Sequence, residues 1–240
     1  MLDPDSTLVP LAEDSTPPVQ GLLHRPSEPS GDALVLAHGA GSNSRAPLLV
    51  AVAAAFAAAG FTVLRCDLPY RQKRPHGPPF PGEASQDRAG LRNVVNALRR
   101  LEPAGSCQRI FLGGHSYGGR QASMLAAEDP AIASGLILLS YPLHPPRRPE
   151  QLRTAHLPSL HAPSLFVLGT RDPFGSPEEM TAALKLIPAR TSLLLVESAA
   201  HDLRFGRKAG RRDVGNELPC RIVDAFRLLL EEGKSAGGST

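Results

Sequence analysis

The chain contains no tryptophan among its 240 residues, and aromatic residues make up only 5% of it. Its three cysteines, Cys66, Cys107 and Cys220, lie far apart and form no CxxC pair. This spacing excludes a disulfide framework and a cysteine-based zinc site, and no other cluster has metal-ligand spacing. We therefore expect no metal and a reducing compartment, the cytoplasm.

Long apolar runs are also missing. The longest, from Leu48 to Ala59, is mostly alanine and too short to cross a membrane. The first residues, Met1 to Asp5, are acidic and lack the basic start and apolar core of a signal peptide. The net charge of +3 gives little attraction for nucleic acid. We therefore expect neither a membrane nor a nucleic acid as partner.

What the chain does have is a series of continuous apolar runs separated by helix-compatible segments. These runs span residues 33–37, 61–66, 109–112, 135–140, 164–168 and 192–196. Such runs are typical of buried parallel strands, and their alternation with helices predicts a three-layer α/β/α sandwich with a mostly parallel sheet. A shorter segment, Val19 to Leu23, predicts a strand of an edge hairpin.

The pattern predicts one domain without an internal repeat. We place this single α/β domain at residues 19–232, after an N-terminal extension over residues 1–18 and before a flexible Gly/Ser-rich tail at 233–240. The connection from Pro142 to Pro163 is short and rich in proline, which excludes several helices there, so no large cap domain is expected.

A candidate nucleophile lies in the turn after the apolar run at 109–112. Gly114, Ser116 and Gly118 match the G-x-S-x-G pattern of a nucleophile elbow, and a helix-compatible segment follows. Small neighbours are needed because the strand and helix backbones nearly touch in such a turn. The helix N-terminus directs its N–H groups to the place where negative charge develops. The pattern also occurs in ordinary turns, so the partners of Ser116 must be sought elsewhere.

A serine nucleophile needs a base, and the base needs an acid that fixes its tautomer. His201, in the loop after the last expected strand, is the candidate base. Asp172 is the favoured acid, because it also follows a strand and gives the order Ser, Asp, His. Asp202 and Glu197 remain alternatives, although Asp202 adjoins the histidine and would reach its ring with difficulty.

The developing oxyanion needs two backbone N–H groups about 3 Å away. Tyr117, directly after the serine, supplies one candidate, and Ala40 in the HGAG turn at residues 38–41 supplies the other.

Basic residues are frequent in the loops that follow the expected strands. We expect Arg71, Arg74, Arg147 and Arg148 to bind substrate, and further basic residues lie at Lys73, Arg204, Arg207, Lys208, Arg211 and Arg212. Because loops at the carboxyl ends of parallel strands border one site, these cations predict an anionic substrate. The alternatives are that they keep the loops soluble or contact a partner.

The motifs HGAG, GHSYGG, GTRD and AAH occur in this order, and through them the chain resembles the α/β-hydrolase superfamily from Val19 to Leu230. It is similar to small capless hydrolases related to dienelactone hydrolases. GHSYGGRQ and GTRDPFG make it most similar to the branch with testis-expressed and chromatin-complex hydrolase-like proteins. The resemblance implies that Ser116, Asp172 and His201 form the triad. Dienelactone hydrolases proper carry cysteine as nucleophile, whereas this chain has serine.

These observations predict a serine hydrolase that cleaves a small-molecule ester or thioester through an acyl-enzyme, without a cofactor. Peptidase or acyltransferase activity on the same triad is an alternative. A catalytically idle fold used for protein interaction is another, against which the intact triad argues.

Overall fold

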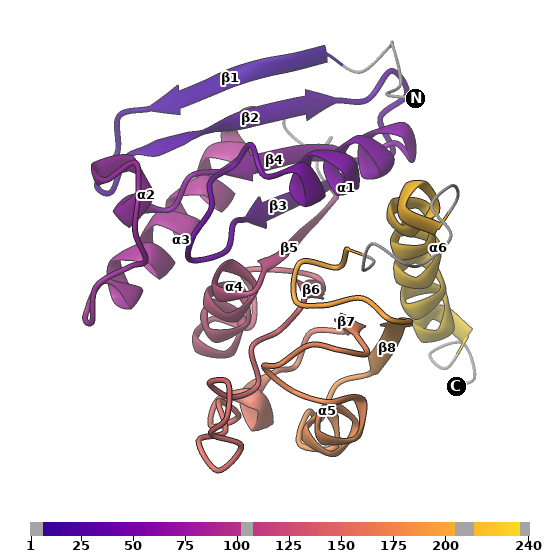
Figure 1. Cartoon of the computed structure of the whole chain (residues 1–240). Coiled ribbons are helices and arrows are strands. Elements are labelled where there is room, and N and C mark those ends of the chain that lie inside the picture. The colour runs from indigo at the N-terminus through magenta and orange to yellow at the C-terminus, as the bar shows by residue number, and fades with distance from the viewer. Residues whose placement is uncertain (1–6, 102–107, 205–213, 236–240) are drawn as a thin grey trace.

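The computed structural model describes residues 7–101, 108–204 and 214–235. Its strands form one eight-stranded sheet in the order β1-β2-β4-β3-β5-β6-β7-β8 (Figure 1). The strands are β1 (Thr7–Glu13), β2 (Val19–Arg25), β3 (Asp32–Ala37), β4 (Thr62–Cys66), β5 (Arg109–His115), β6 (Leu136–Leu139), β7 (Ser164–Gly169) and β8 (Thr191–Val196). β3 to β8 pair in parallel, and β1 and β2 add an antiparallel hairpin at the edge.

Helices cover both faces of the sheet. They are α1 (Pro47–Ala58), α2 (Pro69–Lys73), α3 (Ala84–Leu101), α4 (Tyr117–Glu128), α5 (Pro177–Leu184) and α6 (Val214–Ser235), with a 3₁₀ turn η1 (Leu157–Ser159). In Figure 1, α1 and α6 lie on one side of the sheet and α3 and α4 on the other. Along β3, Leu34 and Leu36 pack in one core, whereas Ala33 and Val35 pack in the other. The three-layer α/β/α prediction is confirmed.

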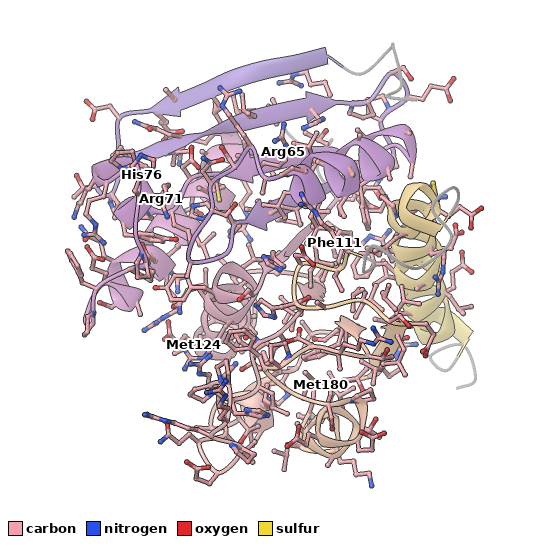
Figure 2. All side chains as sticks on the ribbon, viewed as in Figure 1. Arg65, Arg71, His76, Phe111, Met124 and Met180 are labelled. Carbon is pink, nitrogen blue, oxygen red and sulfur yellow. The ribbon has the colours of Figure 1, made fainter. Side chains whose placement is uncertain are left out.

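The core beneath α1 and α6 combines aliphatic side chains with a cluster of phenylalanines. Phe111 of β5, labelled in Figure 2, packs edge-on against Phe226 of α6 with ring centroids 5.0 Å apart. Phe56 of α1 has the same relation to Phe61 at 5.1 Å. Edge-to-face aromatic pairs of this kind add to the stabilisation from apolar burial.

Three sequence expectations need correction. Thr7–Glu13 forms β1 and pairs with β2, so part of the expected extension over residues 1–18 belongs to the sheet. α6 continues to Ser235, past the expected domain end at residue 232, and residues 236–240 lie outside the described part. The segment from Tyr70 to Lys73, expected as a loop, is helical because Pro69 at the first helical position is preorganised for a helix.

The connection from residue 142 to residue 163 is described completely and contains η1 as its only helical turn. This connection therefore carries no cap domain, as expected. Among the described residues, no helix combines the length and apolar character that a membrane crossing requires.

Candidate active site

Ser116 is the single residue between β5 and α4. Its backbone has φ 51° and ψ −115°, a left-handed conformation that a residue with a Cβ adopts only under strain. The strain is maintained because β5 ends at His115 and α4 begins at Tyr117, so one residue must turn the chain. Ser116 is thereby projected from the carboxyl edge of the sheet.

Glycines allow the helix to pack directly on the neighbouring strands. A Cβ on Gly114 would lie 2.2 Å from the carbonyl oxygen of Ala37, and one on Gly118 would lie 2.5 Å from that of His38. Both obstacles are backbone atoms, which cannot move aside as a flexible side chain can. The spacing of the elbow pattern therefore reflects the close approach of both β5 and α4 to the end of β3.

Ser116, His201 and Asp172 form a continuous chain of hydrogen bonds. The Oγ of Ser116 lies 2.8 Å from Nε2 of His201, and Nδ1 of His201 lies 2.9 and 2.8 Å from the two carboxylate oxygens of Asp172. An ionised carboxylate can only accept, so Nδ1–H donates to Asp172 and Nε2 accepts from the serine hydroxyl. This tautomer is the one that a general base requires.

The alternative acids lie elsewhere. Asp202 is an exposed side chain whose Oδ2 lies 3.8 Å from Nε of Arg204, and Glu197 is also exposed. The carboxylate of Asp172 is fully buried, and its Oδ1 also accepts the N–H of Phe174 at 2.9 Å. Among the three candidate carboxylates, the structure brings only Asp172 to the imidazole.

Two further residues hold His201. The ring of Phe174 lies against its imidazole, with centroids 4.1 Å apart and planes 31° from parallel. The Nε2–H of His115 donates to the carbonyl oxygen of His201 at 2.8 Å. Burial lowers the pKa of His115, so its ring is neutral and carries a single N–H. Neither residue was expected at the site from the sequence. The one sequence feature that could have indicated them is their position, within two residues of Ser116 or Asp172.

The two expected oxyanion donors have free amides. Tyr117 is the first residue of α4, where backbone N–H groups have no partner within the helix. Ala40 lies in a turn closed by the N–H of Ser42, which donates to the carbonyl of Gly39 at 3.0 Å. Within the described part of the chain, neither the Ala40 amide nor the Tyr117 amide donates to a protein acceptor. Both amides are therefore available to a ligand.

The side chain of Arg71, which we expected to bind substrate, is instead turned toward backbone carbonyl oxygens. Its side chain is buried, and Nε donates to the carbonyl of Ser42 at 2.7 Å, while Nη2 donates to Ala40 at 3.0 Å and to Gly77 at 2.8 Å. The guanidinium thus supplies donors to backbone carbonyl oxygens of the HGAG turn, of Ser42 beside it and of Gly77 in the segment after α2.

Arg74 is also occupied. Both of its terminal nitrogens donate to the carboxylate of Glu83, at 2.9 and 2.8 Å, and its guanidinium lies 3.8 Å from the centre of the Phe80 ring. This pairing neutralises the charge that we expected to attract substrate.

Arg147 and Arg148 are exposed in the connection between β6 and β7. Among the described residues, no carboxylate forms an ion pair with either. Lys73 donates to Gln86, and Arg204 is exposed. The remaining basic positions, Arg207, Lys208, Arg211 and Arg212, lie outside the described residues. No group of three or more metal-ligating side chains gathers in the described part of the chain.

The chain is similar to known proteins in both sequence and structure. A family model described as an alpha/beta hydrolase domain matches residues 30–218. The dienelactone hydrolase from Anabaena variabilis is similar in structure, with a TM-score of 0.70 and 20% identity over 93% of this chain and 98% of that one. Est1E from Butyrivibrio proteoclasticus is similar with a TM-score of 0.70 and 17% identity, over 92% of this chain and 99% of that one.

XC6422 from Xanthomonas campestris, described as a member of the α/β serine hydrolases without a lid, gives a TM-score of 0.61 and 15% identity over 99% of this chain and 98% of that one. At such low identity these structures support the fold, whereas the family match covers most of the sequence. The chain therefore belongs to the α/β-hydrolase domain family.

Proposed function

We propose that this chain is a serine hydrolase that cleaves a carboxylic ester or thioester through an acyl-enzyme. The observation that carries the proposal is the hydrogen-bond chain from Ser116 through His201 to Asp172, with contacts of 2.8 Å on each side of the imidazole. This arrangement provides a nucleophile, a base in the correct tautomer and a buried acid that orients the base.

In the proposed reaction, His201 Nε2 takes the proton of Ser116 as Oγ forms a bond to the substrate carbonyl carbon. The amides of Ala40 and Tyr117 stabilise the oxyanion that results. The intermediate then collapses, the bond to the leaving alcohol or thiol breaks, and His201 returns the proton to it. A water molecule repeats the attack on the acyl-enzyme, releasing the acid and restoring Ser116.

Two features indicate the substrate. Because the connection from residue 142 to residue 163 carries no cap domain, we propose an open site that favours short or protruding acyl groups. A series of ester chain lengths and lipid micelles tests this. Best activity on long-chain esters, with a sharp rise on micelles, would contradict an open site. The exposed Arg147 and Arg148 support a preference for anionic esters or thioesters.

The proposed location is the cytoplasm. The described cysteines are both free, with Cys66 buried and Cys220 exposed, which is consistent with a reducing compartment. Mass spectrometry of the protein isolated from its own cells under alkylating conditions should find these thiols unpaired, and a disulfide at Cys220 would argue against this location.

The direct test is labelling by a fluorophosphonate probe. Wild type should be labelled and Ser116→Ala should not, because the probe forms a bond only with an activated serine. Ser123→Ala is the matched control: Ser123, on the helix that follows Ser116, also has its Oγ 2.8 Å from a histidine, Nε2 of His156, but it is buried. This variant should be labelled like wild type.

Each outcome separates the alternatives. Labelling that persists in Ser116→Ala would overturn the assignment of the nucleophile. A folded wild type that is neither labelled nor active on any ester would indicate an idle fold used for protein interaction. Labelling together with faster cleavage of amides, or with acyl transfer to added alcohols, would indicate a peptidase or an acyltransferase.

A further inference from the structure

One buried carboxylate joins the two halves of the expected oxyanion site. Asp87 of α3 is fully buried. Its Oδ2 accepts the hydroxyl of Tyr117 at 2.7 Å, and its Oδ1 accepts the backbone N–H of Tyr70 at 3.2 Å. The rings of Tyr70 and Tyr117 pack edge to face with centroids 5.9 Å apart. Asp87 therefore contacts the residue that supplies one amide and the residue that holds the turn of the other.

Tyr70 and Arg71 hold the turn around Ala40. The hydroxyl of Tyr70 lies 2.9 Å from the carbonyl oxygen of Ala40 and 3.2 Å from that of Gly39. Nη2 of Arg71 donates to the same Ala40 oxygen at 3.0 Å, while its Nε holds Ser42. Three carbonyl oxygens of the turn, those of Gly39, Ala40 and Ser42, thus lie against side-chain donors from α2.

His38 completes the turn from the strand side. The N–H of Leu68 donates to its Nε2 at 3.1 Å, so the proton of the neutral ring lies on Nδ1, which is 2.9 Å from the Gly39 carbonyl. In a planar trans peptide, the Gly39 carbonyl and the Ala40 N–H point in opposite directions. Donors that fix this carbonyl on the side of Tyr70 and His38 therefore fix the Ala40 N–H on the opposite side.

We propose that Asp87, Tyr70 and Arg71 are positioning residues that hold the Ala40 and Tyr117 amides in register for the oxyanion. This inference rests on the proposed serine-hydrolase function and deepens it. Oxyanion stabilisation depends on donors held at about 2.7–3.1 Å from the developing charge, so a small displacement of either amide weakens it. The buried network fixes both amides before substrate binds.

The test compares an ester with its thionoester, whose C=S sulfur accepts hydrogen bonds poorly and gains little from the oxyanion site. Tyr70→Phe should lower kcat/KM for the oxygen ester about tenfold or more, with little change in KM, because the loss is confined to the transition state. The loss for the thionoester should be smaller, so the ratio of the two kcat/KM values falls. Affinity for a trifluoromethyl ketone should fall in parallel with kcat/KM.

Tyr141→Phe is the matched control. It also removes a buried tyrosine hydroxyl, which donates to the carbonyl of Arg153 at 2.6 Å, and should leave the ratio of the two kcat/KM values unchanged. Asp87→Asn should behave like Tyr70→Phe, since an amide NH₂ would face one of the two donors. Thermal unfolding of each variant shows whether it is folded. If Tyr70→Phe does not fold, Tyr117→Phe or Arg71→Lys repeats the test.

The inference is overturned if Tyr70→Phe and Asp87→Asn are folded and keep the wild-type ratio of the kcat/KM values for the ester and the thionoester. It is also overturned if this ratio falls in them no further than in Tyr141→Phe. Failure of the proposed function gives a different result, because wild type itself would then neither react with fluorophosphonate nor hydrolyse the oxygen ester.

Discussion

Nε2 of His115 lies 2.8 Å from the carbonyl oxygen of His201, so the residue before the candidate nucleophile supports the backbone of the candidate base. The two imidazole rings also contact each other, with centroids 5.3 Å apart. The two residues are 86 positions apart in the chain. The contact ties the elbow to the loop after β8, so the distance between Ser116 and His201 depends on more than the triad itself.

Removing this support should reduce turnover moderately. In His115→Ala the loop of His201 loses one neutral hydrogen bond, worth about 1 kcal/mol, so we expect kcat to fall about fivefold. His115→Gln, which retains an N–H donor, should recover part of the loss. Steady-state kinetics with a saturating ester measures both, and full turnover in His115→Ala would show that the contact has no role in catalysis.

The triad residues should act as a unit. His201→Ala should lose as much activity as Ser116→Ala, several powers of ten, and the double variant should lose little more. Asp172→Asn should be milder but still severe, because the base loses its tautomer control.

The same kinetics tests the choice of acid. Asp202→Asn and Glu197→Gln are matched controls, because both carboxylates are exposed, and they should leave turnover unchanged. If Asp172→Asn left turnover unchanged while either control variant were inactive, Asp172 would not be the acid of the triad.

Glycine at the helix–strand contact should contribute strongly to stability. Gly118→Ala would place a methyl group 2.5 Å from the His38 carbonyl oxygen, and we expect it to lower the free energy of unfolding by about 3 kcal/mol. Gly41→Ala is the control, since a Cβ there meets nothing within 4 Å, and should change stability by less than about 0.5 kcal/mol. Urea denaturation compares the two, and equal effects would contradict the packing argument.

His24 should make the protein less stable in acid. Nε of Arg65 donates to Nε2 of His24 at 2.8 Å, and burial, with the Arg65 charge, lowers the pKa of His24 from 6.5 to about 4. Between these values the unfolded chain binds the proton and the folded chain does not, so the free energy of unfolding decreases as pH falls. The loss from this residue has an upper limit of about 3 kcal/mol.

Urea titrations at pH 7.5 and 4.5 measure this effect. His24→Gln keeps an acceptor for Arg65 but cannot titrate, so it should lose less stability on acidification than wild type. His76, which is exposed and labelled in Figure 2, provides the control: His76→Gln should lose as much as wild type. Identical acid sensitivity in wild type and His24→Gln would reject the assignment.

Arg147 and Arg148 should make hydrolysis of anionic esters sensitive to salt. Exposed charges are screened over about 8 Å at physiological ionic strength, so kcat/KM for an anionic ester should fall with added salt. A neutral ester of equal size should hardly respond. Reversing both charges, with Arg147→Glu and Arg148→Glu, should abolish the difference, and equal salt curves for the two esters in wild type would remove these arginines from substrate capture.

The sequence by itself determined the layered architecture and the elbow. Each buried parallel strand is a local apolar run, and the alternation of such runs with helical segments admits few topologies. The elbow pattern, with glycines at 114 and 118, is also local in the sequence, although the backbone atoms that those glycines accommodate belong to the end of β3, which lies far away in the chain. The hairpin strand β1 escaped prediction because Pro10 lies inside its apolar segment, and a proline within such a segment argues against a strand except at a sheet edge.

Tertiary structure decided which carboxylate meets the histidine and which arginines remain free. Asp172 and His201 are 29 residues apart, and only the pairing of β7 with β8 brings their loops together, whereas Asp202 adjoins His201 in sequence and points elsewhere. Arg71 and Arg148 look alike in sequence, as basic residues in Pro-rich segments. The difference between them arises because a guanidinium turns inward wherever folding leaves several carbonyl oxygens without donors, and that need exists only once distant segments have packed together.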